Sequence, residues 1–198
     1  MKQLFLKIGV FVCIVAVGVV ILNAPYFLKQ FSYIFGTTEA PLPAINQDNP
    51  SVELGEPNQI KIPSLNIIAP LQYVTEINED VFQQALQSGV VHYPGTAEIG
   101  QPGNAYFFGH SSDFVFAKGD YKTVFALLPR IKNGAEILVT DKEGKVYHYE
   151  VIDQRAVDND DVEVLDQKEF KQKLLTLQTS YPVGTALRRY IVVGRLKD

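Results

Sequence analysis

The sequence predicts an all-β fold: a closed or nearly closed antiparallel β-barrel with short helices, preceded by an N-terminal transmembrane helix. Three observations lead to this prediction. Many short apolar runs are separated by glycine and proline turn signals, and only two segments among them have a helical pattern. A doubly wound α/β fold would need a helix between successive strands. Finally, a long uncharged run near the N-terminus is too uniformly apolar for a helix of a small soluble domain.

The uncharged run covers residues 8–28 and defines the predicted membrane anchor. A helix of this length is about 30 Å long, which is enough to cross the hydrocarbon core of a bilayer. Lys2 and Lys7 precede the run and Lys29 follows it, so we expect residues 1–7 in the cytoplasm and the rest of the chain outside the cell membrane. A cleaved secretory signal is the alternative, although no cleavage site of the Ala-x-Ala kind follows the run.

A juxtamembrane segment and a stalk are predicted over residues 29–58. The aromatic residues 31–35 suit the membrane–water interface. Four prolines between residues 36 and 58 interrupt any regular element, so we expect an extended stalk there. The folded domain is then expected to occupy residues 59–198.

The domain is expected to contain mainly short strands. Residues 141–144, Asp-Lys-Glu-Gly, carry a strong hairpin signal between two alternating runs. Short helices are predicted at residues 80–87 and 121–128, where Ser88-Gly89 and Pro129 end the patterns. Extended segments are predicted at residues 60–62, 65–71, 104–109, 136–140, 145–153, 174–179 and 189–196.

Charge and cysteine content exclude several classes of protein. The chain has 18 basic and 22 acidic side chains, and a net charge of −4 argues against a nucleic-acid-binding protein. Residues 1–36 hold three lysines and no acid, which leaves 15 bases and 22 acids for the remainder. The single cysteine, Cys13, lies within the anchor. An internal disulfide framework and a cysteine-based zinc site are therefore excluded, and we expect no thiol in the aqueous domain.

Among the three histidines, His110 has the setting of a general acid or base. It leaves an apolar strand and enters the polar loop Ser111-Ser112-Asp113. A fixed backbone behind the imidazole and water in front of it is what proton transfer requires. We expect His92, before a Tyr-Pro-Gly turn, to form structural hydrogen bonds, and His148 to be solvated on one face of its strand.

A hydroxyl and a guanidinium are expected to meet at a second place. The strand at residues 174–179 delivers Ser180 at its end, and the next strand begins at Arg189. If these strands are adjacent and antiparallel, the two side chains lie close together, and arginine can stabilise an oxyanion formed during acyl transfer. The alternative is a polar turn with a surface arginine.

Three runs of sequence together resemble the sortases, which are bacterial cysteine transpeptidases of the cell envelope. The resemblance extends from Ile60 to Leu196, and the N-terminal anchor agrees with it. It implies an eight-stranded barrel of sortase type, and it identifies His110 as the family's histidine. The family's Arg-x-Ile-Val pattern falls on Arg189, with Arg188 as a neighbour of lesser claim. The runs are VVHYPGTA, GNAYFFGHSS and TLQTSYPVGTALRRYIVVGRL.

The resemblance also implies a reaction and its partners. A sortase cleaves a C-terminal sorting signal of the Leu-Pro-x-Thr-Gly kind at the threonine carbonyl and forms an acyl-enzyme. It then passes the acyl group to an amine of a peptidoglycan precursor or of another surface protein. This chemistry needs no cofactor and no metal, so the expected partners are sorting-signal peptides, the amine acceptor and the membrane.

One position departs from the family pattern. Sortases have Thr-Leu-x-Thr-Cys where this chain has Thr-Leu-Gln-Thr-Ser, so Ser180 occupies the position of the catalytic cysteine. A serine hydroxyl does not ionise near neutral pH and needs His110 as a general base. Three interpretations remain open: an active serine enzyme, a natural peptide-binding module with little or no turnover, and a cysteine-to-serine knockout.

An acidic loop follows residue 157. Its carboxylates could bind calcium, as in some sortases, but the spacing differs from that of an EF-hand, and a solvated acidic loop is the preferred interpretation. The acidic residues are Asp158, Asp160, Asp161, Glu163 and Asp166.

Overall fold

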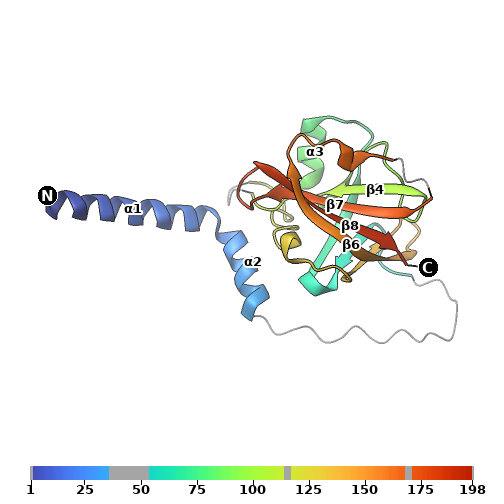
Figure 1. Cartoon of the computed structure of the whole chain (residues 1–198), viewed down its shortest axis with the longest axis horizontal. Coiled ribbons are helices and arrows are strands. Elements are labelled where there is room, and N and C mark those ends of the chain that lie inside the picture. The colour runs from blue at the N-terminus through green and yellow to red at the C-terminus, as the bar shows by residue number, and fades with distance from the viewer. Residues whose placement is uncertain (1, 36–53, 114–116, 168–170, 198) are drawn as a thin grey trace.

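The computed structural model describes residues 2–35, 54–113, 117–167 and 171–197, and within them eight strands close into a barrel (Figure 1). The order around the barrel is β1-β2-β3-β4-β7-β8-β6-β5. The predicted closed eight-stranded barrel is thus confirmed. The strands are β1 (Gln59–Ile62), β2 (Ile67–Tyr73), β3 (Val90–His92), β4 (Gly103–Phe108), β5 (Glu136–Thr140), β6 (Val146–Asp158), β7 (Lys173–Tyr181) and β8 (Arg188–Leu196).

The barrel is mixed, and the prediction of a purely antiparallel sheet was wrong. β2 pairs with β3 in parallel, and so does β4 with β7, whereas the other neighbouring pairs are antiparallel. Parallel neighbours need a crossover connection. The helix α3 (Glu79–Leu86) supplies it between β2 and β3, and the β5–β6 hairpin lies within the connection between β4 and β7.

Alternation along the strands separates the inside of the barrel from its outer face. Ala105 and Phe107 of β4, and Leu175 and Leu177 of β7, belong to the main core cluster and are almost fully buried. Because successive side chains of a strand point to opposite faces, the even-numbered residues of both strands lie on the outer face. Val192 of β8 belongs to the same core cluster, so the odd-numbered residues of β8 also lie on the outer face.

Local sequence signals account for α3 and for the hairpin turn. The Asn78 side chain caps α3 by accepting hydrogen bonds from the backbone N–H groups of Asp80 and Val81, at 2.9 and 3.3 Å. Asp141 Oδ1 accepts from the backbone of Glu143 and Lys145 in the turn between β5 and β6. The predicted helix 80–87 and the predicted hairpin are both confirmed.

Two local predictions were wrong. Residues 121–128 were predicted to be helical, but they form successive turns that end in a short 3-10 helix, η2 (Leu128–Arg130). The buried strand β3 was not predicted, because three residues are too few to show alternation. Tertiary packing stabilises β3, since Val90 and Val91 are fully buried. Two further 3-10 helices are η1 (Pro63–Leu65) and η3 (Glu163–Leu165).

The N-terminal segment forms two helices where one helix over residues 8–28 was predicted. α1 (Lys2–Leu22) and α2 (Ala24–Phe35) meet at Asn23. No single helix in the described residues combines the length and apolar character needed to cross a bilayer. Lys7–Leu22 and Ala24–Phe35 meet that requirement together, by length and composition only, and they are bent by 74°.

The stalk lies largely outside the described residues. Its end is described from Leu54, which forms an isolated bridge with Lys145 beside the β5–β6 turn. The backbone N–H of Gly55 donates to the carbonyl of Gly144 at 2.8 Å. The chain is therefore already attached to the barrel a few residues before β1.

Candidate active site

The ends of β4 and β7 bring His110 and Ser180 onto neighbouring strands. The parallel register pairs Phe108 with Gln178, and the N–H of Gly109 donates to the Gln178 carbonyl at 3.1 Å. Neighbouring strands are about 4.8 Å apart. His110 and Ser180 each follow this pair by two residues, so they lie side by side at one end of the barrel.

Arg189 lies beside Ser180 from the other side. The antiparallel register of β7 and β8 pairs Ser180 directly with Arg189, and alternation places both side chains on the outer face. Both residues are half-buried. The Arg189 guanidinium donates from Nη1 to the carbonyls of Ala186 and Arg188, at 3.2 and 3.3 Å. The arginine is thus held against the loop between β7 and β8, next to the serine.

Arg188 is directed elsewhere. Its Nη2 donates to the Ala156 carbonyl of β6 at 3.0 Å, and its Nε lies 3.5 Å from a carboxylate oxygen of Asp158. The side chain is exposed and sits over β6. Of the two adjacent arginines, Arg189 is the one on the side of Ser180.

Several contacts fix the backbone around His110. The Thr179 hydroxyl, which is fully buried, donates to the Gly109 carbonyl at 2.8 Å. The N–H of Phe125 donates to the His110 carbonyl at 2.9 Å. A Cβ on Gly109 would lie only 2.8 Å from Phe125 Cδ2, so glycine is required for this close approach. His110 therefore rests on a rigid support.

The two loops at the site are also joined to each other. The backbone N–H of Gly184, in the β7–β8 loop, donates to the Ser112 hydroxyl at 3.0 Å. Ser112 follows His110 by two residues, and Gly184 lies between Ser180 and Arg189. This hydrogen bond couples the loop that carries the histidine to the loop that carries the arginine.

Burial favours the neutral form of His110. Partial desolvation lowers the pKa of the imidazole below its ordinary value of 6.5, and the nearby Asp113 carboxylate opposes that shift to a smaller extent. A neutral imidazole at neutral pH can accept a proton from a hydroxyl. The site thus offers a serine hydroxyl on β7 and a neutral base just beyond the end of β4, with a guanidinium beside the serine.

Tyr106 and Gln178 lie next to the serine, the histidine and the arginine, and the sequence did not predict them as site residues. The Tyr106 hydroxyl donates to Gln178 Oε1 on the outer face. Burial raises the pKa of Tyr106, and the positive charge of Arg189 opposes the rise, which places the phenol within electrostatic reach of the guanidinium. The period-two pattern leading back from Ser180 through Gln178 was the signal that could have identified Gln178.

A groove lies on the same outer face, toward the start of β7 from Ser180. It has a volume of about 370 Å³, and Thr176, the outward residue before Gln178 on β7, lies in its floor. The loop between β6 and β7 forms the opposite wall and is fastened there, because Asn104 Nδ2 donates to the Val164 carbonyl. The lining residues are Asn104, Arg155, Glu163, Val164, Asp166, Leu174, Thr176, Ile191 and Val193.

The other two histidines are not part of this group: His148 lies toward the opposite end of the barrel, and His92 lies on β3 opposite Phe107 of β4. His92 is buried, and its Nε2 is within 3.0 Å of both the Ala97 carbonyl and the Thr96 hydroxyl. His148 pairs with Glu136 across the β5–β6 ladder at 3.1 Å, so it is not simply solvated as predicted. His92 has the structural role that the sequence predicts.

The acidic residues after β6 form local contacts. The Asp161 carboxylate accepts a hydrogen bond from the Glu163 backbone at 3.0 Å, and Asp158 faces Arg188. Among the described residues, no group of three or more histidine, cysteine, aspartate or glutamate side chains is arranged to hold a metal ion.

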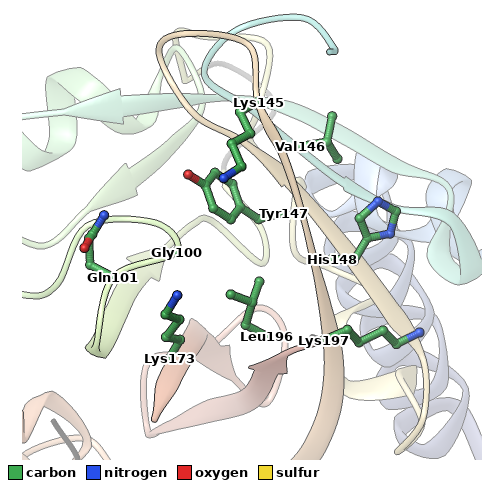
Figure 2. Close-up of a pocket in the computed structure, with 9 residues that line it drawn as sticks. All are labelled: Gly100, Gln101, Lys145, Val146, Tyr147, His148, Lys173, Leu196 and Lys197. Carbon is green, nitrogen blue, oxygen red and sulfur yellow. The ribbon is translucent and has the colours of Figure 1, made fainter. Parts of the chain in front are cut away.

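A second pocket lies at the opposite end of the barrel. It has a volume of about 520 Å³, and its lining includes Tyr147 and three lysines. Figure 2 shows Lys145 and Lys173 directed toward the space near Tyr147, whereas His148 and Lys197 project away from it. The pocket includes Lys173 at the start of β7, seven residues before Ser180, and its lining holds no serine or cysteine nucleophile.

Comparison with known proteins gives consistent results. A family model described as the sortase domain matches residues 60–197. The chain is 27% identical to sortase D of Bacillus subtilis (strain 168) over 164 residues, which is 81% of this chain and 74% of that protein.

Solved structures agree with this match. Sortase C-1 of Actinomyces oris is 27% identical with a TM-score of 0.59, and the match covers 71% of this chain and 72% of that one. A Clostridium perfringens sortase D5 transpeptidase, at 22% identity and a TM-score of 0.58, shares the fold over 74% of this chain and 82% of its own.

Proposed function

Because the chain belongs to the sortase family, we propose that it is a cell-envelope transpeptidase in which Ser180, His110 and Arg189 perform the acyl transfer. One observation carries the proposal: β4, β7 and β8 bring a hydroxyl, a neutral imidazole and a guanidinium to the same end of the barrel. The substrate is a sorting-signal peptide of the Leu-Pro-x-Thr-Gly kind, as the resemblance implies.

The first half-reaction forms an ester on Ser180. His110 accepts the hydroxyl proton while the Ser180 oxygen attacks the threonine carbonyl carbon of the peptide. The tetrahedral intermediate then collapses, the C–N bond breaks, and the departing amine takes the proton from His110. Because a hydroxyl needs a base, the lowered pKa of His110 fits a serine nucleophile.

Arg189 stabilises the negative charge on the former carbonyl oxygen. Its guanidinium donates to two neutral loop carbonyls in this structure. A charged oxyanion is a stronger acceptor than a neutral carbonyl, so the guanidinium exchanges one of these bonds for the oxyanion when the intermediate forms. Tyr106 and Gln178 form the floor next to it.

The groove along β7 and β8 receives the peptide. Ile191 and Val193 supply apolar contacts, whereas Asn104, Arg155 and Glu163 supply polar ones. An extended peptide placed there runs along the outer face toward Ser180. In the second half-reaction an acceptor amine attacks the ester carbonyl carbon, and His110 takes a proton from that amine. The C–O bond to Ser180 then breaks, and His110 returns the proton to the Ser180 oxygen.

Location follows from the same family. Sortases belong to the cell envelope, and we propose that the apolar N-terminal helix anchors this chain in the cell membrane with the barrel outside. The acceptor is then an amine available at the outer surface, in a peptidoglycan precursor or in another surface protein.

Intact-mass spectrometry of the full chain in detergent tests the function. After incubation with sorting-signal peptides, we expect an added mass equal to the N-terminal peptide fragment, lost in Ser180→Ala. An adduct on Ser180→Cys but none on the unaltered chain would show a competent barrel without an active nucleophile. Saturable peptide binding with no adduct on either chain would contradict the proposed transferase and indicate a peptide-binding module.

A further inference from the structure

One face of α2 is fastened to the barrel. Lys29 Nζ donates to the carbonyls of Thr123 and Val124, at 2.8 and 3.3 Å. One turn further along the helix, the Arg130 guanidinium lies 5.7 Å from the centre of the Tyr33 ring. Residues at helical spacing make up this face, and we call it the barrel face. Tyr26, Lys29 and Gln30 in it are partly covered, and Tyr33 is 39% exposed.

The opposite face of α2 is apolar and uncovered. Phe31 is 62% exposed and Phe35 is 69% exposed. Soluble proteins rarely leave a contiguous row of large apolar side chains in water. We call this row the apolar face: Phe27, Leu28, Phe31, Ile34 and Phe35.

The direction of α1 indicates what covers the apolar face. From residue 8 to residue 22, α1 carries no charged side chain, as a helix surrounded by lipid requires. The bend between the two helices is 74°, so if α1 enters the bilayer along its normal, α2 lies close to the plane of the membrane. In Figure 1, α1 extends away from the barrel, and α2 continues from its end after the bend, beside the barrel. The bend thus places α2 between the bilayer and the barrel.

We infer that α2 lies in the membrane–water interface at the end of α1, with its apolar face in lipid and its barrel face holding the barrel. Interfacial helices of this kind sink their apolar side about 5–10 Å into the boundary between headgroups and acyl chains. The bent pair is then one helix embedded in the bilayer followed by one helix at its surface.

This arrangement holds the candidate active site near the bilayer. Lys29 binds the segment whose next residue, Phe125, is hydrogen-bonded to the His110 carbonyl. Asn23, at the bend, lies beside Gly184 of the β7–β8 loop. Both loops at the site are therefore next to α2. The consequence for catalysis rests on the proposed function. A site held near the bilayer meets a peptide substrate that is presented at the membrane surface.

The sequence contains no tryptophan, so one introduced tryptophan reports its own surroundings. We would place Phe31→Trp and Ile34→Trp on the apolar face and Tyr26→Trp, as the matched control, on the barrel face. Each full chain is reconstituted in phosphatidylcholine–phosphatidylglycerol vesicles with brominated acyl chains. We expect several-fold stronger quenching at positions 31 and 34 than at position 26, with blue-shifted emission.

Two results would overturn the inference. Equal quenching at positions 26 and 31 would mean that lipid surrounds α2 and that α1 and α2 cross the bilayer together. No quenching at positions 31 and 34 would mean that α2 does not reach the lipid. Neither readout requires turnover, so the proposed reaction can fail independently.

The contact with the barrel has a separate test in the Tyr26→Trp background. Lys29→Met removes both hydrogen bonds to the barrel, and we expect the tryptophan at position 26 to become more strongly quenched as the barrel separates from α2. Lys132→Met, at an exposed lysine of the barrel, should leave the quenching unchanged. Unchanged quenching in Lys29→Met would contradict the proposed docking.

Discussion

Ser180, His110 and Arg189 divide the proposed chemistry into three physical roles. The hydroxyl supplies the nucleophile, the imidazole takes its proton, and the guanidinium meets the developing charge. Each role depends on surroundings that the structure supplies: the strand ends for Ser180, partial burial for His110, and the β7–β8 loop for Arg189. Two predictions belong to this scale.

Arg189→Ala should reduce the rate of acyl-enzyme formation about 10²–10³-fold, which is typical for removal of one oxyanion donor. Arg188→Ala is the matched control, because Arg188 is bonded to β6 and directed away from Ser180. Stopped-time mass spectrometry of the adduct measures both rates. A larger loss in Arg188→Ala would reassign the oxyanion donor.

The rate of acyl-enzyme formation should depend on pH through His110. Burial lowers the pKa of His110 below 6.5, so the neutral base persists below that pH, and the rate should fall on the acid side with a midpoint under 6.5. The unfolded chain binds the proton more readily than the folded chain, so the stability of the domain should also decrease as the pH falls through this range. The His110→Gln variant should lose the activity, and the decrease in rate at acid pH should disappear with it. A midpoint above 6.5 would contradict the role assigned to burial.

At the scale of elements, the parallel pairing of β4 with β7 determines which residues meet at the candidate active site. It brings two segments 70 residues apart into register, and Thr179 locks the last position by donating to the Gly109 carbonyl. Thr179 points into the barrel and does not touch the reacting atoms, so we regard it as a positioning residue.

Thr179→Val should lower the turnover rate with little change in the peptide KM, because it frees the backbone that carries His110. Loss of this bond leaves a buried carbonyl unpaired, which costs about 1–3 kcal/mol of unfolding free energy. Tyr149→Phe is the matched control, since the Tyr149 hydroxyl accepts from the Gly100 backbone N–H at 2.8 Å, away from the site. Thermal unfolding should show similar destabilisation in both variants. Equal turnover in the two would contradict the positioning role.

At the scale of the whole molecule, the barrel and the N-terminal helices have different environments. The core residues of the barrel run from Ile60 to Val192 and enclose one apolar interior. α2 contacts the barrel through a few polar and aromatic groups at its surface. The unfolding free energy therefore depends on the barrel, and we propose that the helices determine where the protein is located.

A chain shortened to residues 54–198 should unfold in a single cooperative transition, with a Tm close to that of the full chain. The apolar interior and the contacts of Leu54 and Gly55 with the β5–β6 turn are all retained. Thermal denaturation followed by circular dichroism measures both transitions. A broad, non-cooperative transition in the shortened chain would show that the helices contribute to the core.

The sequence by itself determined the barrel, the helix α3, the β5–β6 turn and the positions of His110, Ser180 and Arg189 along the chain. These follow from alternation, turn residues and short motifs, which are local properties. Tertiary structure alone decided the parallel pairings, the burial of β3, the bend at Asn23 and the contact between Tyr106 and Gln178. The physical reason is that pairing direction and burial depend on partners far away in the sequence, and no local pattern specifies those partners.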